Sequence, residues 1–468
     1  MTISSREPTV SAAGWTALFG REHGPVAVTL AAGVALHAVN VYLAATIMPS
    51  VVDDIGGSSL YAWATTVFMF ASVLGSAAAA AVLGARGPRS SYRFAALLLA
   101  AGTTVCALAP SMLVLLAGRL VQGLGGGLLF ALSYAMVRIT LHEALWPRAM
   151  ALVSAMWGVA TLIGPALGGV CAQLGAWRDA FWGLLPFLLF FGFWGAMRLP
   201  KGKAGGVTPR IPWMSVSLLG LAVLVISAAS ISSRLMVNAA GLLLAALLLV
   251  GWLRRERRTT LRLIPATAFG SDPRLRFVYL TMALLVLSST VEVYIPYFGQ
   301  RLQGLGPLAA GYLGAVLAAG WTLGSVACSG MSHRSRSIIS TGPVVTLAGL
   351  AGLFFAGPVH SGTVAAIAAV SVALLALGWG IGMAWPHLLT RVLQLAPDAD
   401  QELAGSSVTT VQLTATAFGS ALAGTVANVI GFSDNAGTGD LQSTARWMFG
   451  LFALAPLAAV VTTRYARR

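Results

Sequence analysis

Gly158-Val-Ala-Thr-Leu-Ile-Gly164-Pro165-Ala-Leu-Gly168-Gly169-Val170 lies inside a long apolar segment. Each glycine costs an isolated helix about 1 kcal/mol relative to alanine, so a helix this rich in glycine depends on its neighbours for stability. Small residues on one face let a second helix approach closely, as membrane helix pairs do. Pro165 adds a bend because it removes one backbone donor. An ordinary, tightly packed pair of membrane helices would show the same residues.

The composition around this stretch is that of a polytopic membrane protein. Of 468 residues, 57% are hydrophobic and only 9% are charged, and apolar runs near the length of a membrane span recur from end to end. The net charge of +15 comes from basic residues in short loops, which is a topology signal rather than a nucleic-acid patch. The three cysteines, Cys106, Cys171 and Cys328, indicate neither a disulfide framework nor a metal site. No ATP-binding motif is present, and we expect no cofactor.

The apolar runs predict fourteen helical spans with both termini in the cytoplasm. In this arrangement the only arginines or lysines on the outer side are Arg178, Arg234, Arg301 and Arg446, and Arg119 lies within a span. The spans are 25–49, 60–83, 93–110, 112–137, 149–173, 179–198, 212–231, 235–253, 277–300, 307–330, 338–357, 362–390, 406–430 and 444–463.

These spans group as six, two and six. Two six-helix bundles that face each other across a central cavity are typical of transporters built from repeats. We expect the middle pair to face lipid, because its apolar faces at 218–225 and 242–248 carry almost no polar residue. The predicted segments are a cytoplasmic start (1–24), the first bundle (25–198), a linker with two extra helices (199–276), the second bundle (277–463) and a cytoplasmic tail (464–468).

The glycine-rich stretch resembles the antiporter motif of drug:proton exporters in the major facilitator superfamily, and the chain is similar to that superfamily's fourteen-helix drug:proton antiporters. The motif residues are Gly158, Gly164, Pro165, Gly168 and Gly169. The resemblance extends to the stretches 47–57 (IMPSVVDDIGG), 116–126 (LAGRLVQGLGG), 177–181 (WRDAF) with Pro186, 296–311, and 378–382 (GWGIG). It implies an all-α major facilitator fold in the inner (plasma) membrane of the cell.

Two positions depart from the family pattern. The cytoplasmic loop motif, with Arg86, Gly87 and Arg89, has Gly84 where the family normally carries an acid. The first helix carries Asn40 where the family often has an aspartate. The loop charge relay is therefore in doubt, and any proton-binding role of the first-helix acid is moved or lost.

Charge inside a bilayer is costly, so ionisable residues within the spans are functional candidates. Glu292 lies about 22 Å along its span, in the outer half of a ~30 Å core, and a buried carboxyl there can bind and release a proton near neutral pH. Arg119 corresponds, by resemblance, to an arginine that influences protonation of a nearby acid. His37 is a candidate because histidine is the side chain whose ordinary pKa lies in the useful range. For each, a purely structural hydrogen-bonding role remains the alternative.

A second group of residues forms the predicted lipophilic substrate site. Aromatic faces suit flat cationic or amphipathic molecules, although tryptophan and tyrosine also populate interfacial belts. Asn40 is a hydrogen-bonding candidate, and the polar stretch around Gln412 either lines the pore or joins helices. The candidates are Asn40, Phe68, Gln122, Trp157, Tyr294, Tyr297, Trp321 and Gln412.

The leading interpretation is a monomeric, proton-coupled exporter of lipophilic, possibly cationic compounds that works by alternating access, with protons and the lipid bilayer as its other partners. One alternative is dedicated export of an endogenous lipid or metabolite. A non-transporting membrane receptor is disfavoured because no soluble signalling domain is evident. An enzyme is disfavoured because no nucleophile–base pair or metal cluster appears at a membrane face.

Overall fold

The computed structural model describes residues 15–202, 211–397, 400–433 and 436–466, and within these ranges every regular element is helical. The first part comprises α1 (Trp15–Leu18), α2 (Gly24–Ile55), α3 (Trp63–Ala107), α4 (Met112–Thr140), α5 (Trp146–Gln173) and α6 (Trp177–Phe190), then α7 (Trp213–Ser230) and α8 (Leu235–Arg258). The second part comprises α9 (Arg274–Ser289), α10 (Ile295–Arg301), α11 (Pro307–Cys328), α12 (Ser335–Ala356), α13 (Val364–Leu395), α14 (Gln401–Ile430), α15 (Thr438–Phe452) and α16 (Leu454–Ala466). Short 3₁₀ segments lie at Ser58–Leu60 (η1), Glu143–Leu145 (η2), Ala266–Phe269 (η4), Thr290–Tyr294 (η5) and Ser332–Arg334 (η6), and a π-helical turn at Phe191–Gly195 (η3).

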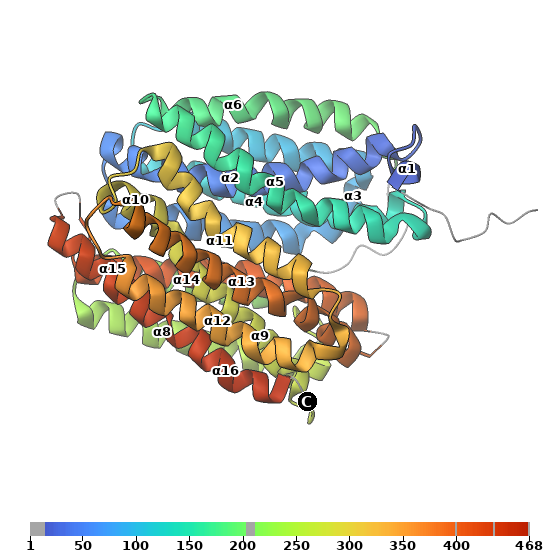
Figure 1. The fold of residues 1–468 in the computed structure, drawn as a ribbon. Coiled ribbons are helices and arrows are strands. Elements are labelled where there is room, and N and C mark those ends of the chain that lie inside the picture. Colours follow the sequence, from blue (N-terminus) through green and yellow to red (C-terminus); the bar gives the residue numbers. More distant parts are fainter. Residues whose placement is uncertain (1–14, 203–210, 398–399, 434–435, 467–468) are drawn as a thin grey trace, which may run out of the picture.

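The helices form two groups that lie side by side. Figure 1 shows the N-terminal helices (α2–α6, blue to green) above the C-terminal helices (α9–α16, yellow to red). The described chain starts and stops at the same end of the molecule, which we call the terminal end (Figure 1). Within the described residues, twelve helices are long and apolar enough to cross a membrane.

Several predicted boundaries differ from the structure, and the predicted span 444–463 is divided at Ala453 between α15 and α16. The predicted spans 60–83 and 93–110 are joined in α3, which breaks only at Gly87 (φ 74°), a conformation that favours glycine. The predicted span 179–198 begins as α6 and continues into the π-helical turn at Phe191–Gly195. The number of fourteen crossings and the cytoplasmic position of both termini stay predictions.

The glycine-rich stretch lies in α5, between one helix of each group. A Cβ atom on Gly164 would come within 2.6 Å of the Tyr42 Cβ atom on α2. A Cβ atom on Gly169 would come within 2.6 Å of the Leu308 Cα atom on α11. Glycine is therefore required on two faces of α5, because each face brings the backbone into direct contact with a neighbouring helix.

The α7–α8 hairpin spans the seam between α3 and α14, so it touches both groups of helices. The Trp63 indole N–H on α3 donates to the Ser227 carbonyl at 3.0 Å, and the Asn428 amide on α14 donates to the Ser230 carbonyl at 2.7 Å. Gly220 packs directly on the ring of Phe70.

The prediction that this hairpin faces lipid stays a prediction for α8 and is wrong for much of α7. On α8, Leu243 is 64% exposed. On α7, Leu219, Ala222 and Val223 are buried, because this helix fills the seam against α3 and α14.

Ion pairs gather at the end of the molecule opposite the terminal end. Asp54, at the end of α2, accepts hydrogen bonds from the Trp177 indole at 3.1 Å and the Arg178 guanidinium at 2.6 Å. The neighbouring Asp53 forms an ion pair with Arg301 of α10. The first contact therefore stays within the N-terminal helices, whereas the second joins the two groups.

The loop motif at the break in α3 holds the end of the sixth helix. Arg89 donates to the carbonyls of Met197 (2.5 Å) and Leu199 (3.0 Å), which are acceptors left free at a helix C-terminus. The Arg86 guanidinium lies 4.1 Å from the centre of the Phe94 ring. Gly84 offers no carboxylate to this loop, and the motif arginine Arg89 bonds to backbone carbonyls instead.

Candidate functional site

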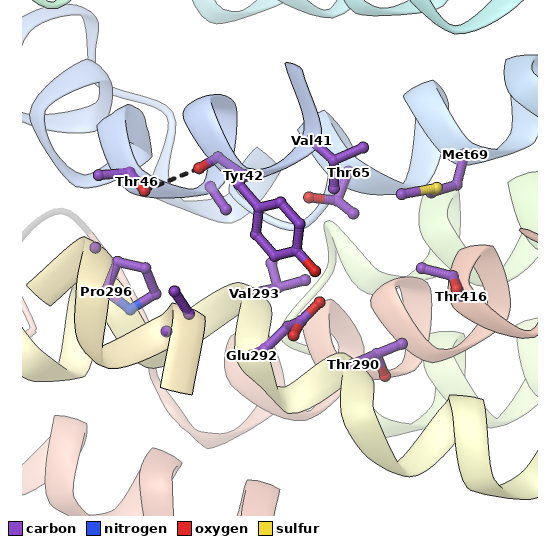
Figure 2. A pocket seen from close by; sticks show the side chains of 14 residues that line it. Val41, Tyr42, Thr46, Thr65, Met69, Thr290, Glu292, Val293, Pro296 and Thr416 are labelled. Atoms are coloured by element: carbon purple, nitrogen blue, oxygen red, sulfur yellow. Dashed lines mark hydrogen bonds between the residues drawn. The ribbon is translucent and has the colours of Figure 1, made fainter. Parts of the chain in front are cut away.

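A pocket lies between the two groups of helices, and Figure 2 shows the residues that line it. Its walls come from α2 and α3 on one side and from η5, α10, α11 and α14 on the other. Its free space is about 30 Å³, which accommodates one or two water molecules. The lining residues are Val41, Tyr42, Ala45, Thr46, Thr65, Met69, Thr290, Glu292, Val293, Pro296, Gly311, Gly314, Ala315 and Thr416.

Glu292 is the acidic residue of this pocket, and it lies where the helix is interrupted. The predicted continuous span 277–300 is divided into α9, the 3₁₀ segment η5 and α10. Pro296 has no N–H to donate to the carbonyl of Glu292, four residues earlier, and that carbonyl accepts instead from the N–H of Ile295. A 3₁₀ stretch inside a longer helix often marks a functional site. The interruption directs the Glu292 carboxylate into the pocket (Figure 2).

The Glu292 carboxylate has no basic partner in the part of the chain that the structure describes, whose ion pairs are Arg178–Asp54, Arg274–Asp272 and Arg301–Asp53. Across the pocket stands Tyr42 of α2, and Figure 2 shows its hydroxyl and the carboxylate pointing toward each other. The Tyr42 ring packs edge-on against Trp157 of α5, with ring centres 6.5 Å apart.

Three threonine hydroxyls of the pocket wall are already engaged with backbone carbonyls. Thr46 donates to the carbonyl of Tyr42 at 2.8 Å. Thr290 donates to that of Leu287 at 2.7 Å, and Thr416 to that of Gln412 at 3.0 Å. Their hydroxyl hydrogens are therefore directed into the helices that carry them, and not at Glu292.

Arg119 lies in the closed interior of the N-terminal helices and does not line the pocket. The side chain is 1% exposed. Its Nε donates to the Ala64 carbonyl at 3.0 Å, and its Nη1 donates to Asn40 Oδ1 and to Gln122 Oε1, the latter at 2.9 Å. The guanidinium also lies 4.1 Å from the centre of the Phe68 ring. The structure thus brings three other predicted site residues, Asn40, Gln122 and Phe68, around the Arg119 cation, whose observed hydrogen-bond acceptors are neutral.

His37 lies beside this cluster and is fully buried. Its ring centre is 5.3 Å from those of Phe68 and Phe130 and 6.0 Å from that of Trp157. Neither ring nitrogen has a hydrogen-bond partner among the described residues. The histidine is therefore enclosed by aromatic rings, separate from the wall that carries Glu292.

The remaining predicted substrate-site residues lie in other parts of the fold. Tyr294 and Tyr297 surround Tyr61 of the N-terminal helices, with ring centres 4.8 Å and 5.6 Å away. Trp321 packs against Trp385 at 5.1 Å. Gln412 is one turn from the pocket residue Thr416. Of the predicted proton and substrate residues, Glu292 lines the pocket. The proposed roles of all of them stay predictions.

The sequence interpretation missed the α2 wall of the pocket. Val41, Tyr42, Ala45 and Thr46 are spaced so that they share one face of a helix, next to the face that carries His37 and Asn40. This spacing was visible in the sequence. What it did not reveal is which face of α2 meets the C-terminal helices.

Comparisons with known proteins agree with this architecture. The family model of the Major Facilitator Superfamily matches residues 30–424. The chain is 41% identical over 467 residues to a probable multidrug-efflux transporter of Mycobacterium tuberculosis, covering 97% of this chain and 96% of the relative.

Solved transporters share the fold at low sequence identity. A D-xylose–proton symporter superposes with a TM-score of 0.68 at 14% identity, covering 94% of this chain and 96% of its own. A POT family transporter in complex with 5-aminolevulinic acid superposes with a TM-score of 0.69 at 12% identity, covering 96% of this chain and 98% of its own. Together with the family match and the membrane-spanning helices, these findings show that the chain belongs to the Major Facilitator Superfamily and is a multi-pass membrane transporter rather than an enzyme.

Proposed function

We propose that this transporter is a monomeric, proton-coupled exporter of lipophilic cations in the plasma membrane, of the multidrug-efflux type. The observation that carries the proposal is a single carboxylate, Glu292, facing a pocket between the two groups of helices without a basic partner among the described residues. The similarity to probable multidrug-efflux transporters supports the direction and the breadth of transport.

An unpaired carboxylate in a low-dielectric site is costly, and either a proton or a cationic substrate removes that cost. The two therefore compete for one group. Binding of the substrate on one side of the membrane releases the proton, and uptake of a proton on the other side releases the substrate. Exchange of protons for cations follows from this competition.

Alternating access is supported by the small size of the pocket. Pockets that bind drug-sized molecules measure about 300–1,000 Å³, whereas the free space beside Glu292 is about 30 Å³. Substrate binding therefore requires the N-terminal and C-terminal helices to move apart around Glu292, as the rocking of two halves provides.

Glu292→Gln tests this function directly. In proteoliposomes with an imposed pH gradient, we expect the wild-type protein to drive uphill movement of a cationic dye. We expect the variant to lose that movement and to keep only part of its dye binding, because the amide keeps the shape of the carboxyl but carries no charge and cannot exchange a proton. Efflux and proton flux are followed together, with neutral drugs and lipids as further substrates.

Glu256→Gln is the matched control. Glu256 is also fully buried, but it lies in α8 and accepts the backbone N–H of Leu263 at 3.0 Å. This variant should retain active efflux. Retained active efflux in Glu292→Gln would assign the coupling role to another residue.

A second candidate is the export of one endogenous lipid or metabolite. It is favoured by Asn40, a neutral residue that hydrogen-bonds Arg119 where the resembling exporters often carry an acid. Untargeted profiling of metabolites and lipids in a deletion strain separates the two: accumulation of a single compound favours dedicated export.

A further inference from the structure

We propose that Tyr42 is the positioning residue for Glu292: its hydroxyl donates a hydrogen bond to the deprotonated carboxylate and so holds the two groups of helices together around the empty pocket. This inference rests on the proposed function, because it assigns the partner of the coupling carboxyl. It also assigns a role to the glycine-rich stretch of α5, which fixes the position of Tyr42.

Tyr42 and Glu292 are the titratable residues among those that line the pocket. The lining residues of α3 are Thr65 and Met69, those of α11 are glycines and an alanine, and that of α14 is Thr416. The nearby cations are engaged elsewhere: Arg119 with Asn40 and Gln122, and Arg301 with Asp53. Tyr42 is thus the titratable side chain that faces the carboxylate from the opposite wall (Figure 2).

The hydrogen-bond donors available to Glu292 are few. Of the four threonines that line the pocket, Thr46, Thr290 and Thr416 donate to carbonyls in their own helices, which leaves the hydroxyls of Thr65 and Tyr42. The described contacts include no hydrogen bond of the Tyr42 hydroxyl, either to Glu292 or to another residue, and in Figure 2 it points at the carboxylate. The proposed bond therefore forms when the two groups draw closer around the charged carboxylate. A phenol is a good donor to a carboxylate, and a charge-assisted bond of this type is about twice as strong as a neutral one.

The glycine-rich helix fixes the position of Tyr42. The absence of a side chain at Gly164 lets α5 approach the Tyr42 Cβ atom, which an added Cβ would meet at 2.6 Å. Trp157 lies about two helical turns before Gly164 and packs edge-on against the Tyr42 ring. The backbone contact and the ring contact together hold the phenol toward the C-terminal helices.

The bond would act as a proton-sensitive link between the two groups. Tyr42 belongs to α2 and Glu292 to η5, so a hydrogen bond between them joins the N-terminal and C-terminal helices. The hydroxyl proton stays on the tyrosine oxygen throughout. When Glu292 takes up a proton it loses its charge, and the bond weakens to that of a neutral pair. A cationic substrate displaces the hydroxyl by taking its place beside the carboxylate.

The test is a pH titration of the Glu292 carboxyl by infrared difference spectroscopy of the purified full-length protein. The carbonyl stretch of its protonated form is identified as the band that Glu292→Gln lacks. Tyr42→Phe keeps the ring contact with Trp157 and the Cβ contact with Gly164, and removes only the hydroxyl. We expect its band midpoint to move to higher pH by about one pH unit, because the carboxylate loses a charge-assisted bond.

Thr416→Val is the matched control, since it removes a pocket hydroxyl that already donates to a carbonyl, and its midpoint should stay at the wild-type value. Tyr42→Met, which also lacks the hydroxyl, replaces Tyr42→Phe if the latter does not fold. An unmoved midpoint in the tyrosine variant, with a normal Glu292 band, overturns the role of Tyr42 and leaves the proposed function standing. If Glu292→Gln removes no titrating band, both proposals fall.

Discussion

Gly164 is the residue at which the packing of α5 on α2 is most sensitive to one added methyl group. We expect Gly164→Ala to lower the thermal unfolding midpoint, since its Cβ would stand 2.6 Å from that of Tyr42 and overpacking of this kind costs about 1–3 kcal/mol. Gly158→Ala is the control: its nearest neighbour would be 4.0 Å away, on Thr322, and alanine favours the helix by roughly 1 kcal/mol. Equal midpoints for the two purified variants would contradict this packing.

Prediction from sequence was strongest for residues whose chemistry is rare in a bilayer. Glu292 was selected because a carboxyl within a span is costly wherever it faces, and the structure places it in the pocket wall. Tyr42 was missed because a tyrosine is ordinary in a membrane helix. Its importance depends on which face of α2 meets η5, which is a tertiary contact without a local signal. Arg119 was selected for its charge, but its separation from Glu292 became visible only in three dimensions.

Among the elements, the α7–α8 hairpin differs most from its prediction, because α7 packs against α3 and α14. We expect Gly220→Ala to weaken its attachment, because an added Cβ would lie 2.0 Å from a ring atom of Phe70, so that either the ring must shift or α7 must move away from α3. Gly251→Ala in α8, with open space around it, should leave the thermal midpoint unchanged or higher. A variant at Gly220 as stable as the one at Gly251 would show that α7 is not held against α3.

Apolar runs predicted the helices well because each run must supply its own backbone hydrogen bonds in lipid. They could not distinguish α7 from α8, since a helix buried against other helices and one facing lipid tails have equally apolar side chains. The division at η5 also escaped prediction, although Pro296 was a visible signal for it.

At the scale of the whole molecule, the ion pair between Asp53 and Arg301 marks a point where the N-terminal and C-terminal helices can be tied together. In a background lacking Cys106, Cys171 and Cys328, we expect cross-linking of Asp53→Cys to Arg301→Cys by a thiol reagent to stop transport, because it ties the N-terminal to the C-terminal helices. Asp54→Cys with Arg178→Cys cross-links two positions within the N-terminal helices and should leave dye efflux unchanged. Full efflux by the first cross-linked pair would mean that this end need not open.

The hairpin over the α3–α14 seam makes the two flanks of the molecule unequal. On that flank α7 and α8 stand between the bilayer and the line where the two groups meet. On the opposite flank α5 and α11 meet directly, and the Tyr312 hydroxyl donates to the Leu162 carbonyl at 3.1 Å beside exposed apolar side chains. Among the described residues no helix covers the α5–α11 contact, so we expect a compound dissolved in a lipid leaflet to reach Glu292 from that flank when α5 and α11 separate.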